Sequence, residues 1–240
     1  FTGYLDFERD IFLVDTDNGN QLINLTQTGV TEADPVWSPD GKYIYFNSAR
    51  HVPNYPKGGG DMNLYRLPLR KFDAPHRAEK FDELFVEKDD KKEKKDSVVV
   101  TIETDGIMER IERVGPSLGS QGGAFIVRDD DKTMVFYGSN HEGERALYMT
   151  TYEPFESLKT KMFKGKGVGN ATDLVEVKGK YYLIGRGKVQ KLNVGQTKFD
   201  AIEVKHTFRR SFAPEFEQMF YETCANMEEN FYDKDFHGVD

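Results

Sequence analysis

Short stretches of alternating apolar and polar residues recur along this chain, and they predict β-strands joined by tight turns. Three segments share one plan, which is an apolar strand, a polar turn and a second, alternating strand. They are DPVWSPDGKYIYFNS (34–48), GGAFIVRDDDKTMVFYGS (122–139) and ATDLVEVKGKYYLIG (171–185). Repetition of this kind predicts one structural unit used several times.

Two further strands are predicted after each of these hairpins. The third strands are NLYRLPL (63–69), RALYMTTY (145–152) and GKVQKLNV (187–194). The fourth strands are MERIERV (108–114), SLKTKMF (157–163) and AIEVKHT (201–207). Four antiparallel strands, repeated along a chain, are typical of the blades of a β-propeller.

The first residues of the chain predict the back of an earlier blade. Residues 1–3 look like the end of a second strand, DIFLVD (10–15) is the third and QLINLT (21–26) the fourth. Closed propellers need about four to eight blades, so residues 1–212 predict an all-β, open arc of about 3.5 blades. We therefore interpret 1–212 as the C-terminal part of a propeller, in a fragment or a processed chain.

One insertion interrupts the repeat. Residues 73–97 lie between the third and fourth predicted strands of the first complete blade, and they include the charged run EKDDKKEKKD. Charged residues in such a mixture stay hydrated, so the charged run, within residues 86–97, predicts a solvated, mobile loop.

The apolar period changes from 2 to 3.6 near the C-terminus. From Pro214 onward, apolar side chains recur on one side of a predicted amphipathic helix. They are Phe216, Met219, Phe220, Met227 and Phe231. We expect this face to dock, and we interpret 213–240 as the start of a second, helical domain.

Composition excludes several classes of protein. Hydrophobic residues make up 38% and charged residues 31%, and no apolar run approaches the roughly 18 residues of a spanning helix. The net charge of −8 argues against nucleic acid as the main partner. The single cysteine, Cys224, excludes an internal disulfide and a cysteine-rich metal site.

Candidate chemistry is sparse. No pair of histidines has metal-ligand spacing, and we predict no catalytic residue, cofactor or metal site here. Cys224 and Trp37 are interpreted as core residues, and Asp129–Asp131 as a hairpin turn. Arg209 and Arg210 are the candidates for substrate binding, because paired guanidinium groups can hold a peptide carboxylate. A pair of interdomain salt bridges is the simpler interpretation of both.

Three motifs resemble a known family. DPVWSPDGKYIYF resembles the WD-like repeat of periplasmic propellers, prolyl-oligopeptidase relatives and tricorn-type proteases. TIETDGIMERIERVG (101–115) is similar to the DxDGIxxRIxRxP closing strand of tricorn-like propellers, with Gly115 in place of the proline. SFAPEFEQMFYETCANMEENFYDKDFHGVD (211–240) resembles the start of the first catalytic-region domain of the tricorn family, with Phe236 in place of methionine.

This resemblance implies a large, multidomain serine protease that cuts peptides. Such enzymes carry propellers, a PDZ-like domain and two catalytic-region domains, and their catalytic serine and histidine would lie downstream of this sequence. The propeller would gate or filter peptides or unfolded polypeptides. The resemblance further implies no cofactor, no nucleic-acid or membrane partner, and a possible homo-oligomer. It suggests a cytoplasmic location, with the periplasm as the alternative.

Two other functions remain open. The first alternative is a non-catalytic, protein-binding propeller of the periplasm. The second is the propeller of a prolyl-oligopeptidase-type enzyme. A scaffold would end at its closing strand, and a prolyl-oligopeptidase relative would continue into an α/β-hydrolase sheet. The predicted C-terminal helix favours the tricorn-like interpretation over both.

Overall fold

The computed structural model describes residues 1–5, 8–16, 19, 21–51, 61–71, 98–165, 173–185, 187–203, 205, 207, 209–232 and 238. The predicted insertion at 73–97 therefore lies outside the described residues, as does Phe236. The chain divides into two units, Phe1–Ile202 and Glu203–Asp240. Among the described helices, none is long and apolar enough to cross a membrane.

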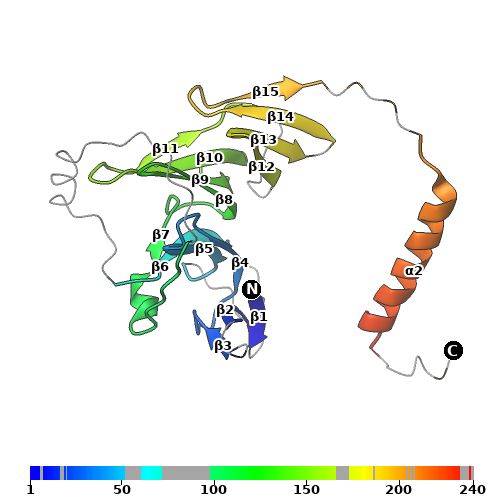
Figure 1. The fold of residues 1–240 in the computed structure, drawn as a ribbon, viewed down its shortest axis with the longest axis horizontal. Helices are drawn as coiled ribbons and strands as arrows, with labels where there is room; N and C mark the ends of the chain where they lie inside the picture. The colour runs from blue at the N-terminus through cyan, green and yellow to red at the C-terminus, as the bar shows by residue number, and fades with distance from the viewer. Residues whose placement is uncertain are drawn as a thin grey trace. The chain divides into compact units, whose positions relative to one another are not determined.

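The first unit consists of successive antiparallel sheets (Figure 1). The first sheet has three strands, β1 (Thr2–Leu5), β2 (Glu8–Asp15) and β3 (Gln21–Asn24). The second has β4 (Glu32–Trp37), β5 (Tyr43–Ser48), β6 (Asn63–Pro68) and β7 (Glu112–Arg113). The third has β8 (Gln121–Asp129), β9 (Lys132–Ser139), β10 (Ala146–Tyr152) and β11 (Lys159–Met162). The fourth has β12 (Leu174–Val177), β13 (Lys180–Gly185), β14 (Lys188–Asn193) and β15 (Lys198–Ile202).

Within every sheet the strands follow one another in chain order, as in propeller blades. Three four-stranded sheets and one three-stranded sheet confirm the predicted three blades plus the back of a fourth. The array is open, which also confirms the predicted arc.

Polar side chains stabilise the turn SPDG (38–41) between β4 and β5. Ser38 Oγ accepts hydrogen bonds from the backbone N–H groups of Lys42 (3.1 Å) and Tyr43 (2.9 Å), and it donates to Asp40 Oδ1 (2.6 Å). Gly41 has a φ of 67°, which glycine adopts without a steric penalty. At the β8–β9 hairpin Asp130 takes a φ of 50°, so the aspartate run forms a turn as predicted.

Two predicted fourth strands are wrong in part. Residues 107–110 form a 3-10 helix, η1 (Ile107–Arg110), so the predicted strand at 108–114 is reduced to β7. Arg110 holds this turn in place, because its Nε donates to Pro68 O (3.1 Å) and its Nη1 to Asp105 O (3.1 Å). Side-chain bonds to distant carbonyl groups leave no signal in strand periodicity.

The other error is in the fourth sheet. The predicted strand at 201–207 begins earlier in the structure, as β15 (Lys198–Ile202). Asn193 Oδ1 accepts a hydrogen bond from the Gln196 N–H (3.1 Å), and Thr197 has a φ of 50°, so residues 194–197 form a tight turn. Because this turn is short, the strand pairs with β14 from Lys198 onward.

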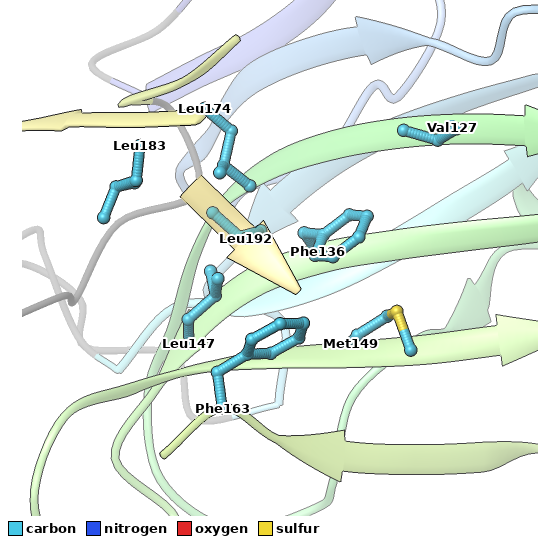
Figure 2. Packing of buried hydrophobic residues seen from close by; sticks show 8 residues of the cluster. All are labelled: Val127, Phe136, Leu147, Met149, Phe163, Leu174, Leu183 and Leu192. Carbon is cyan, nitrogen blue, oxygen red and sulfur yellow. The ribbon is translucent and has the colours of Figure 1, made fainter. Parts of the chain in front are cut away.

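Buried side chains form three clusters in the first unit. Alternate residues of a central strand point to opposite faces, so Phe46 of β5 belongs to one cluster and Tyr45 to the next. The cluster built from the third and fourth sheets contains Val127, Phe136, Leu147, Met149, Phe163, Leu174, Leu183 and Leu192 (Figure 2). Packing between successive sheets therefore supplies the core.

The prediction that Trp37 is a core residue is wrong, because its side chain does not belong to a buried cluster. It is the last residue of β4 and is 45% exposed. Its cross-strand partner is Ile44, which is only 3% exposed and joins the core cluster. A position at the strand end, next to the turn at Ser38, leaves the indole in contact with solvent.

The second unit contains the predicted helix, α2 (Phe212–Asn230), which begins two residues before Pro214. Ser211 is its N-cap residue, and no residue of the helix is buried. The apolar side chains of Phe216, Met219, Phe220 and Met227 are each more than half exposed. Cys224 is exposed, so the prediction of a core cysteine is wrong for this structure. Docking of the apolar face stays a prediction.

Phe155 occupies a strained turn, and relieving that strain is expected to stabilise the fold. The residue follows Pro154 between β10 and β11, has a φ of 66° and is 42% exposed. A bulky residue in this region costs on the order of 1 kcal/mol. Phe155→Gly should therefore raise the free energy of unfolding in urea by about 0.5–1 kcal/mol. Phe155→Ala keeps the strain and is the control; an equal gain from both variants would contradict the argument.

Candidate functional site

The two sequence-predicted candidates precede α2 and are both exposed. Arg210 Nε donates to Glu215 Oε1 in the first turn of the helix, which makes a local ion pair within the second unit. Arg209 makes no ion pair within the described part of the chain. Substrate binding by either residue stays a prediction.

A serine and a histidine do meet, but their geometry is not that of a nucleophile and its base. Ser139 Oγ lies 2.8 Å from His141 Nδ1, and the His141 ring packs against Tyr148 with 4.4 Å between centroids. Ser139 is 0% exposed, so no substrate carbonyl can reach its oxygen. The same oxygen accepts a hydrogen bond from the His141 backbone N–H (3.4 Å), and the pair therefore fixes the bend after β9.

A buried ionic cluster lies at the start of the second sheet. Glu32 opens β4, and its side chain is 0% exposed. Its Oε1 accepts a hydrogen bond from Ser48 Oγ (3.1 Å), its cross-strand partner, and forms an ion pair with Arg50 Nη2. Burial raises the pKa of the Glu32 carboxyl group, although Arg50 and Ser48 favour its charged form.

Aromatic rings and a second arginine complete this cluster. The Arg50 guanidinium carbon lies 5.1 Å from the centroid of Tyr65 and 5.6 Å from that of Phe46. Arg113 of β7 pairs with Tyr65 in register, and its Nε and Nη2 are buried without an acceptor among the described residues. Glu32 Oε2 is buried without a donor there. The carboxylate is closed off from solvent, so the cluster has a role in holding the strands together.

A second arginine sandwich joins the second sheet to the third. The Arg66 guanidinium carbon lies 3.9 Å from the centroid of Tyr152 and 4.9 Å from that of Tyr43. Arg66 Nε and Nη2 both donate to Glu112 Oε2, at 2.7 and 2.6 Å. Burial raises the pKa of Tyr152 to about 12, so this ring is neutral at pH 7. Such a partly desolvated cation–π contact stabilises by about 1–2 kcal/mol.

Exposed apolar residues gather beside the turn at Gly41. Val98, Val99 and Val100 are 54%, 82% and 43% exposed. A Cβ atom on Gly41 would lie 2.7 Å from Val98 Cγ1 and 2.9 Å from Val100 Cγ2, so these valines pass directly over the turn that follows Trp37. Sequence reasoning missed this group, although the run of three valines was a visible signal.

The described residues therefore contain ion pairs that hold strands and sheets together and exposed apolar side chains at Val98–Val100 and on α2, but no catalytic constellation. Within the same residues, no group of three His, Cys, Asp or Glu side chains could hold a metal ion.

Two comparisons with known proteins relate this chain to the tricorn protease. Residues 212–240, which begin at α2, match the tricorn protease C1 domain. The structure is similar to the crystal structure of the tricorn protease, with a TM-score of 0.55 and 15% sequence identity. The similarity covers 94% of this chain and 22% of that one, so the chain spans about a fifth of the solved protein's length. None of the curated proteins matches the sequence. At this identity the structural match shows the fold, and the two matches together support the tricorn-like relationship expected from the motifs.

Proposed function

We propose that this chain is a propeller segment and the start of the catalytic region of a tricorn-like serine peptidase. The propeller segment gates or filters peptides, and residues outside this chain perform the cleavage. One observation carries the proposal: the match to the tricorn protease C1 domain begins where the successive antiparallel sheets have ended. A stand-alone binding propeller has no need of such a domain.

Serine chemistry is the first part to test. The 240-residue chain is expected to show no turnover of a fluorogenic peptide library above a heat-inactivated control, because its described residues offer no accessible nucleophile with a base. A longer protein that includes the sequence after Asp240 is expected to cleave the library. It should also lose activity on treatment with a serine-reactive fluorophosphonate.

Two results would contradict this assignment. Turnover by the repurified 240-residue chain would mean that an active site lies within it. A longer protein that binds peptides but cleaves none would instead favour the non-catalytic, protein-binding propeller.

Filtering is tested with one polypeptide presented in a folded and in an unfolded form. The longer protein should cleave an unfolded polypeptide and leave the same polypeptide intact when a disulfide keeps it folded. Arg66→Met removes the cation–π contact with Tyr152 that helps to join the second and third sheets. It should make cleavage of the folded and unfolded forms more alike, because a looser propeller excludes less. Equal cleavage of folded and unfolded forms by the unaltered protein would rule out a filter.

A further inference from the structure

A run of β-branched residues lies outside every sheet of the described structure. Val98, Val99, Val100 and Thr101 are followed by Ile102, and residues of this kind favour strands. In the structure they form neither strand, helix nor turn. Within the described residues, their backbone groups make no hydrogen bond. This segment therefore has strand propensity together with backbone donors and acceptors that no described strand pairs.

The segment is nevertheless held against the second sheet at both ends. After it, the Glu103 N–H donates to Leu69 O (2.9 Å), and Glu103 Oε2 accepts from the Lys71 N–H (2.9 Å). At the start of the segment, the side chains of Val98 and Val100 lie over Gly41, whose missing side chain leaves room for them. A chain fixed at both ends loses less conformational entropy when it pairs with another strand than a free loop would.

Trp37 adds an exposed aromatic side chain on the same hairpin whose turn, at Gly41, lies under the valines. It ends β4 four residues before Gly41, and 45% of it is exposed. A large exposed aromatic side chain gives a ligand apolar area at low entropic cost. The segment and the tryptophan therefore border the same turn, because the valines lie over Gly41 and Trp37 directly precedes Ser38.

We propose that Val98–Ile102 binds an extended peptide, which pairs with the segment as an added β-strand and places an apolar side chain on Trp37. The choice of ligand rests on the proposed function, since peptides are the substrates assigned there. Main-chain pairing supplies affinity that depends little on peptide sequence, and a side-chain pocket adds modest selectivity. Both properties suit a protein that admits many different peptides.

A peptide fits this site better than a second copy of the chain. Stable protein–protein interfaces bury about 1,200–2,000 Å² in total. Pairing through so short a segment covers far less than that, which is enough for the reversible capture of a peptide and too little for a stable dimer. Concentration-dependent self-association is therefore treated as a competing outcome of the test.

The single tryptophan provides the signal for a binding experiment. The 240-residue chain is titrated with a blocked, uncharged peptide of alternating valine and threonine with one central leucine, and the emission of Trp37 is followed. We expect a saturable shift to shorter wavelength as the indole is covered. The same peptide with N-methyl groups on alternate residues keeps its side chains but loses its donors, and should bind at least about tenfold more weakly.

Variants of the segment provide the matched control. Val99→Pro removes one N–H donor from a residue that is 82% exposed, and it should weaken peptide binding at least about tenfold with unchanged circular dichroism and Tm. Val99→Thr keeps the β-branched shape and the donor, and it should bind within about twofold of the unaltered chain.

Several outcomes would overturn the proposal. They are an unchanged Trp37 emission, equal affinity for the parent and N-methylated peptides, and equal binding by the Val99→Pro and Val99→Thr variants. Self-association that Val99→Pro abolishes, without peptide binding, would assign the segment to a second copy. If the longer protein cleaves peptides while this chain binds none, the inference fails and the proposed function stands.

Discussion

Replacing Phe136 with alanine is expected to lower the free energy of unfolding by about 3–5 kcal/mol. Phe136 lies on β9 and is 0% exposed. Its ring is 5.9 Å from that of Phe163, 6.2 Å from that of Phe125 and 6.0 Å from that of Tyr181, centroid to centroid. Tyr181 belongs to the fourth sheet, while Phe125 lies in the third and Phe163 directly follows it, so the substitution opens a cavity where the two sheets meet (Figure 2).

Urea denaturation followed by circular dichroism measures this loss directly. For a chain of this size the corresponding fall in Tm is about 2–4 °C per kcal/mol. Val177→Ala is the control, because Val177 lies in the fourth sheet but is 51% exposed, and its loss should stay below about 1 kcal/mol. A cost for Phe136→Ala as small as that of the control would show that the third and fourth sheets do not pack in solution as described.

Replacing Glu32 with alanine is expected to cost about 3 kcal/mol. The substitution removes the carboxylate that pairs with Arg50 and leaves that guanidinium group without its counter-charge. The expected cost is at the lower end for a broken buried pair, because the Arg50 side chain is 23% exposed and regains some hydration. Ser38→Ala, which removes only hydrogen bonds within a turn, is the comparison and should cost about 1 kcal/mol. Equal losses from the two variants would contradict the role given to the ion pair.

Glu32 should also give the unfolding free energy a pH dependence of known sign. Burial raises the pKa of this carboxyl group above its value of 4.5 in the unfolded chain. The folded state then holds the proton more tightly, so the contribution of Glu32 is greatest below pH 4.5 and falls as the pH rises through the folded-state pKa. Glu32→Gln cannot titrate and should lack this component. Identical pH profiles for the two proteins between about pH 4 and 7 would contradict the assignment.

The strands were predictable because their signals are local. Alternation in 34–48 and 122–139 needs only neighbouring residues, and so does the tight turn at Gly41. The same holds for α2, whose apolar period appears within its own 19 residues. Strand ends were less predictable, because η1 depends on the side chain of Arg110 reaching Pro68, which is 42 positions away.

The candidate site was less predictable than the fold. Val98–Val100 reads as strand in the sequence, and only the structure shows that it has no partner among the described residues. Glu32 and Arg66 look like ordinary charged residues of alternating strands. Their burial follows from which face meets the next sheet, which a single strand cannot reveal.

By itself the sequence determined the repeating blades, their turns, the C-terminal helix and the tricorn-like motifs, because periodicity and short motifs act over a few residues. The tertiary structure decided that Trp37 is exposed, that Ser139 and His141 form a covered structural pair, and that Glu32 is buried against Arg50. Each of these depends on how strands pair and on which of their faces is covered. Strand pairing and the choice of the covered face are set by the packing of one whole sheet on another. The alternation of residues within a single strand does not predict this packing.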